Sequence, residues 1–341
     1  MKDFLYLFPF FVSFSVSSIL LFLLVFLKKN ISEKRISERH IHKNGISRMG
    51  GAAIILAFVA TLILDKNLFI SNQLWIVIIA SLAILVFGIW DDLQELNWKK
   101  QIFFQLMIVI FIFIMGIRVE YITNPFGGVF DLGIKENFLP SLLFMIVWII
   151  VFMNSMNWVD GIDGLSGGIT LIGAATIFLL SIKPEVNQPP MGIITVALFG
   201  SILAFLIFNF HPAKILAGTS GSMFMGFILA VLAIFAGLKI ATTLLVAAIP
   251  VVDAFWVIYE RIKNKRSIFS PDKRHLHHKL LDLGWSQNKI CLFFYIITIV
   301  IALVSLNTKT AGKSVAIFSV IFIVSAIISI IRKKVYVVEE K

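Results

Sequence analysis

Residues 154–168 read NSMNWVDGIDGLSGG and lie inside a long, largely apolar region that extends from Leu139 to Ile182. Three polar side chains follow at spacings of three, which would place them on one face if the segment were helical. They are Asn157, Asp160 and Asp163. Ionised groups beside hydrocarbon are costly and usually mark function in a membrane protein. We favour a polar site at the membrane rim for a cation, a phosphate or both, over a solvated loop with glycine turns and aspartate caps.

The composition places the chain in a lipid environment. Of its 341 residues, 59% are hydrophobic and 14% are charged, and the mean hydropathy is +0.96. A soluble globular protein is about half apolar and about a quarter charged. The single cysteine, Cys291, lies in an apolar run, which excludes a disulfide framework and a cysteine metal site. The apolar segment 4–27 is too long for the core of a cleavable signal, so we expect it to remain as a span.

Apolar runs of about 17–25 residues predict transmembrane helices. We expect an all-α integral membrane protein with one polytopic domain over residues 1–341 and about eleven transmembrane helices. The predicted spans are 4–27, 50–64, 73–90, 101–117, 139–156, 168–182, 190–209, 222–237, 240–258, 288–306 and 313–331.

The distribution of lysine and arginine predicts the orientation of these spans. Loops on one side, together with the C-terminal tail, carry 22 of the 30 basic residues, and the other side carries 8. We therefore expect the N-terminus outside and the C-terminus in the cytoplasm. The net charge of +11 sits in membrane-flanking loops, and we expect no nucleic-acid partner. The predicted cytoplasmic motif loops are about 28–50, 91–100, 157–168, 210–222 and 259–289.

Two adjacent carboxylates, Asp91 and Asp92, follow the third predicted span. They repel each other, and the dipole at a helix C-terminus disfavours them, unless a cation or a shared proton relieves the charge. We favour a ligand site here over a solvated helix cap. The first loop ends in RHIHKNGISRMGG at 39–51, where His42 and Lys43 fit either a basic flank or an anion site.

Two further loops carry groups that suit anions. Residues 209–222 read NFHPAKILAGTSGS, in which small residues and glycines expose backbone N–H groups. Residues 270–280 read SPDKRHLHHKL, with three histidines among basic residues. The positive surroundings argue against a divalent cation and favour an anion such as a diphosphate, which would favour the charged, donating form of histidine. A basic loop that binds lipid head groups is the alternative.

These motifs, in this order and on one predicted membrane face, resemble the polyprenyl-phosphate N-acetylhexosamine-1-phosphate transferases. That family shares a fold with the phospho-N-acetylmuramoyl-pentapeptide transferase of peptidoglycan synthesis. The resemblance covers about residues 40–285 and includes the DD pair, NWVDGIDGLSGG, FNFHPAKILAGTSGS and SPDKRHLHHKLL. The motif H-L-H-H is similar to the N-acetylhexosamine branch, whose members start O-antigen, enterobacterial common antigen or teichoic acid linkage units.

The resemblance implies an activity and its partners. N-acetylhexosamine 1-phosphate, by default N-acetylglucosamine 1-phosphate, would pass from a UDP-sugar to polyprenyl (undecaprenyl) phosphate, with release of UMP. The implied cofactor is Mg²⁺, with Mn²⁺ as an alternative. The implied partners are UDP-N-acetylhexosamine and polyprenyl phosphate in the bilayer, and a homodimer is left open. The implied location is the bacterial inner membrane, as a multi-pass protein whose active site faces the cytoplasm.

Site residues follow from the resemblance by motif match. The implied catalytic residues are Asp91, Asp92, His275, His277 and His278. The implied metal ligands are Asp91, Asp92, Asn157 and Thr219. The implied substrate-binding residues are His42, Lys43, Asn157, Asp160, Asp163, Asn209 and Arg274. The chemistry agrees, because Mg²⁺ prefers oxygen ligands and phosphoryl transfer depends on positioning and charge neutralisation.

One position departs from the family pattern. Where relatives have Gly-Asp-x-Gly-Ser, residues 218–222 read GTSGS, so the neutral Thr219 replaces a metal-binding aspartate. Metal affinity is expected to fall unless Asp91, Asp92 or Asp160 compensates. A catalytically weakened relative that binds nucleotide sugar or lipid carrier is therefore the alternative to an active transferase. An ion-coupled transporter is less favoured, because the acids lie at span ends on one face and not at the midplane.

Overall fold

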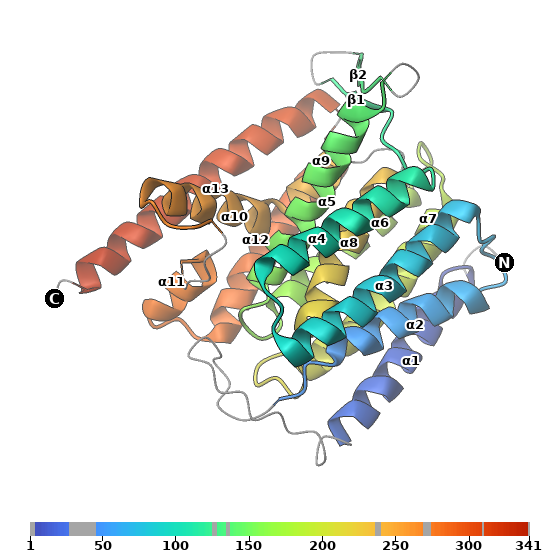
Figure 1. Ribbon diagram of the computed structural model, residues 1–341, viewed down its shortest axis with the longest axis horizontal. Coiled ribbons are helices and arrows are strands. Elements are labelled where there is room, and N and C mark those ends of the chain that lie inside the picture. Colours follow the sequence, from blue (N-terminus) through green and yellow to red (C-terminus); the bar gives the residue numbers. More distant parts are fainter. Residues whose placement is uncertain are drawn as a thin grey trace.

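The computed structural model describes residues 4–26, 46–124, 128–133, 137–235, 240–268, 274–308 and 310–339. These residues form a bundle of helices and one short hairpin (Figure 1). The first helices are α1 (Leu7–Phe26), α2 (Gly50–Leu64), α3 (Asn72–Gln94), α4 (Trp98–Ile114), α5 (Leu139–Val159) and α6 (Leu165–Ser181). The later helices are α7 (Pro189–Asn209), α8 (Gly218–Phe235), α9 (Ile240–Val246), α10 (Ala248–Lys263), α11 (Leu276–Asp282), α12 (Gln287–Asn307) and α13 (Thr310–Glu339).

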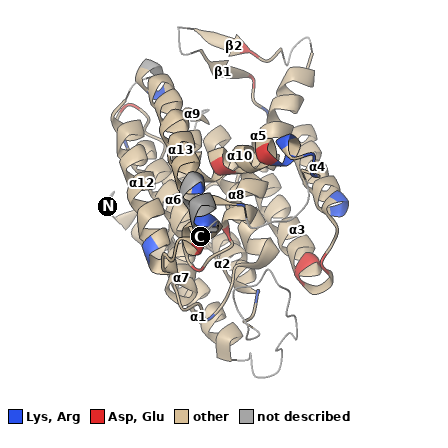
Figure 2. Ribbon diagram, turned by 90° about the vertical axis from the view of Figure 1, so that its left-hand side faces the viewer, with Lys and Arg blue, Asp and Glu red and all other residues tan. Residues whose placement is uncertain are grey.

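The expectation of an all-α membrane protein is confirmed. Among the described residues, seven helices are long and apolar enough to cross a membrane, namely α1, α3, α5, α7, α8, α12 and α13. The bent pair α9 and α10 adds an eighth if it forms one span, and α2 and α6 are shorter apolar helices. Charged residues are sparse along the helices (Figure 2). The total of eleven spans stays a prediction.

Helix α8 lies at the centre of the bundle, where it packs against α2, α3, α5 and α6. Helices in a membrane associate through close packing at small residues. At Gly88, α3 approaches α8 so closely that an added Cβ would lie 2.2 Å from the Cα of Ser220. This contact brings the next turn of α3, which carries Asp91 and Asp92, to the N-terminal end of α8.

The predicted span 240–258 is not one straight helix. The structure has two helices in its place, α9 and α10, whose axes differ by 74°. Pro250 provides the physical reason, because it has no N–H to donate to the carbonyl of Val246, where α9 ends. Helix α10 therefore leaves the direction of α9 and continues to Lys263, beyond the predicted span.

Several motif residues lie in helices that the sequence analysis ended too early. Helix α3 continues to Gln94 and α5 continues to Val159, so Asp91, Asp92 and Asn157 are helical. Helix α3 can extend because the carboxylate of Asp91 accepts the N–H of Leu96, which follows the helix end. The antiparallel hairpin of β1 (Tyr121–Thr123) and β2 (Val129–Asp131) was not predicted, and it lies at the end of the bundle away from α11 (Figure 1).

Candidate active site

Asp91 is held in place by three hydrogen-bond donors. Its side chain lies in the last turn of α3 and is buried. Oδ1 accepts hydrogen bonds from the backbone N–H of Leu96 and from Nε2 of Gln101, both at 3.0 Å. Oδ2 accepts from the hydroxyl of Thr219 at 2.7 Å. The protein alone therefore fixes the orientation of this carboxylate, with Thr219 as its contact on α8.

Asp92 faces the positive end of α8. Both of its carboxylate oxygens accept from the backbone N–H of Thr219, at 3.1 and 3.0 Å. The Nη1 atom of Arg48 lies 3.7 Å from Oδ1. A helix N-terminus favours a negative charge, and a nearby guanidinium does so as well. These two groups offset the repulsion that adjacent carboxylates experience at the end of α3.

Asn157 and Asp160 extend the acidic cluster from α5. Oδ1 of Asn157 accepts from the hydroxyl of Ser222 at 3.3 Å, one turn along α8 from Thr219. The hydroxyl of Ser166 donates to Oδ1 of Asp160. Burial raises the pKa of Asp160 to about 7, and the negative charge of Asp92 also raises it, while the bond from Ser166 lowers it. Asp160, the residue that follows α5, thus lies within electrostatic range of Asp92 on α3.

The expectation that Asn157, Asp160 and Asp163 share one helical face is wrong for Asp163. Helix α5 ends at Val159, and the chain turns before α6 begins. Asp163 points to the following motif loop, where its Oδ2 accepts the N–H of Ala213 at 3.1 Å and lies 2.7 Å from Nδ1 of His211. Its side chain is 2% exposed. In the protein alone, Asp163 therefore joins two motif loops.

Asn209 makes a second connection between the same two loops. Its Oδ1 accepts the N–H of Gly164 at 2.9 Å, and its Nδ2 donates to the carbonyl of Ile215 at 2.9 Å. The residue is 2% exposed at the end of α7. These contacts show how Asn209 shapes the site, and a direct contact with substrate stays a prediction for both Asn209 and Asp163.

The histidine motif begins at the N-terminus of α11. Nδ1 of His275 lies 2.8 Å from Oδ2 of Asp253 on α10. His277 is wholly buried, and neither of its ring nitrogens has a hydrogen-bond partner among the described residues. Burial lowers the pKa of His277 well below its usual value, and positive charge on His278 and His275 lowers it further. The protein alone thus favours a neutral His277, whereas the sequence analysis expected an anion to favour the charged form.

The histidine segment touches the acidic cluster at one point. Gly161 follows Asp160, and a Cβ added to Gly161 would lie 2.4 Å from Nε2 of His277. Only a residue without a side chain allows this approach. The predicted site residues on α3, α5, α8 and α11 therefore meet at one end of the bundle, opposite the hairpin (Figure 1).

Helix α13 contacts the start of the histidine segment at Arg274. Nη2 of Arg332 on α13 donates to the carbonyl oxygen of Arg274 at 2.7 Å. The same guanidinium forms an ion pair with Glu260 of α10, and Glu260 also accepts from Nε1 of Trp256 at 3.2 Å. Arg274, a predicted substrate-binding residue, is thus held through its backbone, and its side chain is not used in this contact.

The acidic cluster offers oxygen atoms for a metal ion. No group of three or more histidine, cysteine, aspartate or glutamate side chains within the described ranges is arranged to bind a metal. Asp91 contacts the hydroxyl of Thr219 at the start of α8, Asp92 contacts its N–H, and Asn157 contacts Ser222 one turn further along the same helix. Such a set fits Mg²⁺, which usually takes one or two protein carboxylates and completes its shell with phosphate oxygens and water.

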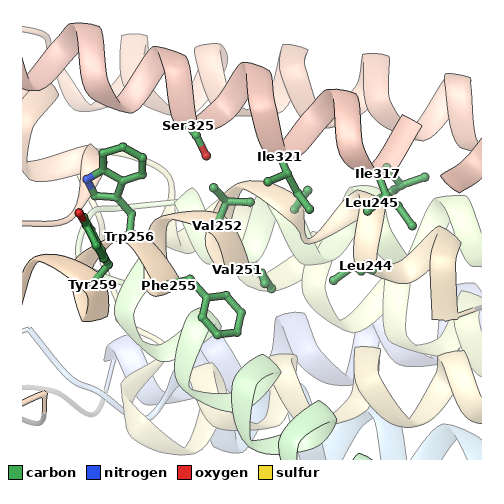
Figure 3. A pocket seen from close by; sticks show the side chains of 11 residues that line it. Leu244, Leu245, Val251, Val252, Phe255, Trp256, Tyr259, Ile317, Ile321 and Ser325 are labelled. Carbon is green, nitrogen blue, oxygen red and sulfur yellow. The ribbon is translucent and has the colours of Figure 1, made fainter. Parts of the chain in front are cut away.

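An apolar cavity of about 460 Å³ lies between α13 and the bent pair α9 and α10 (Figure 3). Aliphatic and aromatic side chains dominate its walls. The lining residues are Leu244, Leu245, Ala248, Val251, Val252, Phe255, Trp256, Tyr259, Ile317, Ile321 and Ser325. Trp256 connects the cavity wall to Glu260, and thereby to the segment that carries the histidines. The cavity therefore suits a hydrocarbon chain, and a series of contacts from Trp256 through Glu260 and Arg332 leads to Arg274 in the histidine segment.

The set of predicted site residues differs from the set that the structure brings together. His42 and Lys43 lie outside the described residues, so the predictions for them have no structural counterpart. The structure adds Arg48, beside Asp92, and Asp253, beside His275, to the candidate site. A signal for Asp253 was present in the sequence, because an acid within a predicted span is by default a functional candidate.

Comparison with known proteins gives the same family as the motifs. Residues 74–237 match the sequence profile of glycosyl transferase family 4. The chain is 31% identical to the probable undecaprenyl-phosphate N-acetylglucosaminyl 1-phosphate transferase of Bacillus subtilis, over 97% of this chain and 93% of that protein. It is 33% identical to the decaprenyl-phosphate N-acetylglucosaminephosphotransferase of Mycobacterium tuberculosis, over 76% and 71%. It is 31% identical to the phospho-N-acetylmuramoyl-pentapeptide-transferase of Lactobacillus gasseri, over 86% and 96%. With a relative at 31% identity aligned over nearly the whole of both chains, this chain belongs to the polyprenyl-phosphate N-acetylhexosamine-1-phosphate transferase family, within glycosyl transferase family 4.

Proposed function

We propose that this protein transfers N-acetylhexosamine 1-phosphate from a UDP-sugar to polyprenyl phosphate and releases UMP. The observation that carries the proposal is the contact between Gly161 and His277, which joins the acidic cluster to the histidine segment. N-acetylglucosamine is the default sugar, because that sugar appears in the names of several relatives. The product would start a cell-envelope glycan such as O-antigen or a teichoic acid linkage unit.

The reaction forms one P–O bond and breaks another. A phosphate oxygen of the lipid attacks the phosphorus that carries the sugar, and the bridging oxygen leaves with UMP and the electron pair of the broken bond. The lipid phosphate is mostly dianionic at pH 7, because its second pKa is about 6. It needs no strong base, so the enzyme contributes in-line positioning and charge neutralisation.

The residues of the site divide these tasks. Arg274 and the histidines of α11 would neutralise and orient the diphosphate of the sugar nucleotide. Asp91 and Asp92 would organise the acidic side, together with the oxygens of Asn157 and Thr219. These four residues would hold Mg²⁺ or Mn²⁺, which when bound supplies positive charge to the phosphate oxygens.

The apolar cavity supports the proposal that the acceptor is a lipid phosphate. Its position against α10 would leave a polyprenyl chain in hydrocarbon surroundings while the phosphate end reaches the polar site (Figure 3). The excess of lysine and arginine in the motif loops supports a site on the cytoplasmic face of the bacterial inner membrane.

A second candidate function is a weakened relative that binds nucleotide sugar or lipid carrier without efficient turnover. Thr219 favours it, because its hydroxyl and its backbone N–H are both committed to the acid pair and bring no charge to a metal. Thr219→Asp separates the two. A large gain in rate or in Mg²⁺ affinity supports a lost ligand and the weakened relative, and no gain indicates a rebuilt, active site.

The direct test is UMP release by the purified protein in lipid nanodiscs. Polyprenyl phosphate and Mg²⁺ are supplied with a panel of UDP-N-acetylhexosamines, including UDP-N-acetylglucosamine, and a parallel reaction contains chelator. We expect UMP with at least one sugar and a lower rate with chelator. Absence of UMP with every sugar would overturn the proposal. Binding of UDP-sugar without turnover would then favour the second candidate.

A further inference from the structure

Asp253 is a buried acid whose two oxygens have different partners. It lies on α10 and is 1% exposed. Oδ1 accepts the backbone N–H of Leu276 at 2.9 Å, which satisfies a free donor at the start of α11. Oδ2 lies 2.8 Å from Nδ1 of His275. One oxygen would suffice to cap the helix, so the second contact calls for its own explanation.

The ring of His275 is fixed on three sides. Asp253 contacts Nδ1, the ring of Trp158 lies 5.6 Å away, and the parallel ring of His277 lies 5.8 Å away. A carboxylate accepts hydrogen bonds and cannot donate them, so the proton of a neutral His275 lies on Nδ1. This assignment leaves Nε2 as the ring nitrogen available to a ligand.

We propose that Asp253 is a positioning residue for the reaction, acting through His275. Its carboxylate holds His275 in the Nδ1–H tautomer and directs Nε2 toward the diphosphate of the sugar nucleotide. A diphosphate at Nε2 would favour a second proton on the ring, so that Nδ1 donates to Asp253 and Nε2 donates to the diphosphate, and Asp253 supplies the counter-charge. The inference rests on the proposed function for the identity of the ligand.

Asp253→Asn is the decisive variant because its shape is unchanged. The amide oxygen still accepts the N–H of Leu276 and keeps the helix cap. The amide nitrogen is a donor, so Nδ1 of His275 must become an acceptor and the ring proton must move to Nε2. We expect the kcat of UMP release to fall about 10–100-fold, because the ring loses the counter-charge that lets both nitrogens donate; carboxylates that orient metal-binding histidines have effects of about this size. Asp253→Glu is expected to recover part of the rate.

The matched control is Asp65→Asn. Asp65 is also a buried acid, 3% exposed, and its Oδ1 accepts the N–H of Asn67 at 2.8 Å beyond the end of α2. It lies at the end of α2 opposite Gly50, away from the motif loops. We expect this variant to release UMP at the wild-type rate. That result would show that the loss of rate in Asp253→Asn depends on the position of this acid and does not follow from the loss of any buried acid.

A double-mutant cycle tests whether Asp253 acts through His275. In a His275→Ala background, Asp253→Asn should lower kcat no further, because its target is absent. An equal loss in both backgrounds would overturn the inference and leave Asp253 as a structural cap. Thermal unfolding of each variant identifies any loss that follows from misfolding.

Nitrogen-15 NMR of histidine gives a readout that needs no turnover. The wild type should show His275 protonated on Nδ1, and Asp253→Asn should show it protonated on Nε2. If the wild type releases no UMP, the proposed function fails and the tautomer shift still tests the pair. An unchanged tautomer would overturn the inference even in an active enzyme.

Discussion

The acidic cluster and the histidine segment are held in different ways. The carboxylates of Asp91 and Asp92 accept hydrogen bonds from the backbone and side chains of three elements of the chain. Within the part of the chain that the structure describes, His277 has no hydrogen-bond partner, and it is held by burial and by packing against Gly161. Polar groups inside proteins are usually paired, so the two halves differ in what fixes them. Hydrogen bonds and charge hold the acid pair, steric fit holds His277, and the contact with Asp253 holds His275.

The largest expected effect is the loss of charge in the acidic half. Asp92→Asn keeps an oxygen that can accept the N–H of Thr219, so the cap of α8 is retained while the charge beside Arg48 is lost. If Asp92 organises the phosphates, kcat for UMP release should fall at least about 100-fold, the scale of losing one electrostatic contact to a transition state. Asp65→Asn serves as the control. A loss below about threefold would place the acid pair outside the chemistry.

A steric change at Gly161 should displace the histidine segment from the acidic cluster. Gly161→Ala places a methyl group against the buried ring of His277 and must displace one of the two segments. We expect UMP release to fall about 10–100-fold, because a shift of about 1 Å in a positioned group costs that much. Gly167→Ala is the matched control, since its Cβ would lie 3.4 Å from a Phe205 ring atom, an ordinary contact. Equal rates for the two variants would contradict the role of the Gly161 contact.

Much of the bundle was predictable, because apolar length alone marks a membrane helix. The meeting of four motif loops followed from their shared position at span ends. The bend between α9 and α10 was missed although Pro250 marks it, because hydropathy does not report direction. The hairpin is too short to show a strand pattern.

The detailed geometry of the site was less predictable. The bonds of Thr219 to Asp91 and Asp92 depend on the close approach of α3 and α8, which no local pattern reports. Asp163 was placed on the wrong face because α5 ends at Val159, four residues before it, and the chain turns before α6 begins. Spacing arguments hold within one helix and fail where the helix ends.

The raised pKa of Asp160, which precedes Gly161 between the acidic cluster and the histidine segment, predicts that the stability of the protein depends on pH. Burial raises its pKa to about 7, whereas an unfolded chain releases this proton near pH 3.9, about the usual aspartate value. The native state therefore binds more protons between these values, and stability falls as pH rises through this range. Asp160→Asn removes this penalty and keeps an acceptor for Ser166. Its melting temperature, relative to wild type, should rise more at pH 8 than at pH 4.5.

The measurement is thermal unfolding of both proteins in detergent with chelator, because a bound cation would favour the ionised carboxylate. Each unit of pKa difference is worth about 1.4 kcal/mol, so even a partial shift is detectable. A difference between the variants that is the same at both pH values would show that Asp160 is ionised in the native state. The acidic half would then tolerate three charges without a cation.

The smallest expected effect comes from removing the contact between α13 and the histidine segment. Arg332→Met removes the bond to the carbonyl of Arg274 and leaves Glu260 with only the Trp256 donor among the partners described above. Losing one partner of a charged hydrogen bond costs about 1–3 kcal/mol, and Glu260 is 21% exposed, so we expect the lower part of that range. UMP release should fall only a few-fold, because Asp253 still holds His275.

Arg332→Lys is the control, since it keeps the charge while losing the planar fork that contacts Glu260 and Arg274 together. Thermal unfolding and UMP kinetics should place Lys between Met and wild type. If Asp253 and packing hold the histidines without α13, both variants keep a KM for the UDP-sugar close to wild type. A large rise in KM for Arg332→Met, with a normal melting temperature, would show instead that α13 sets the position of the histidines directly.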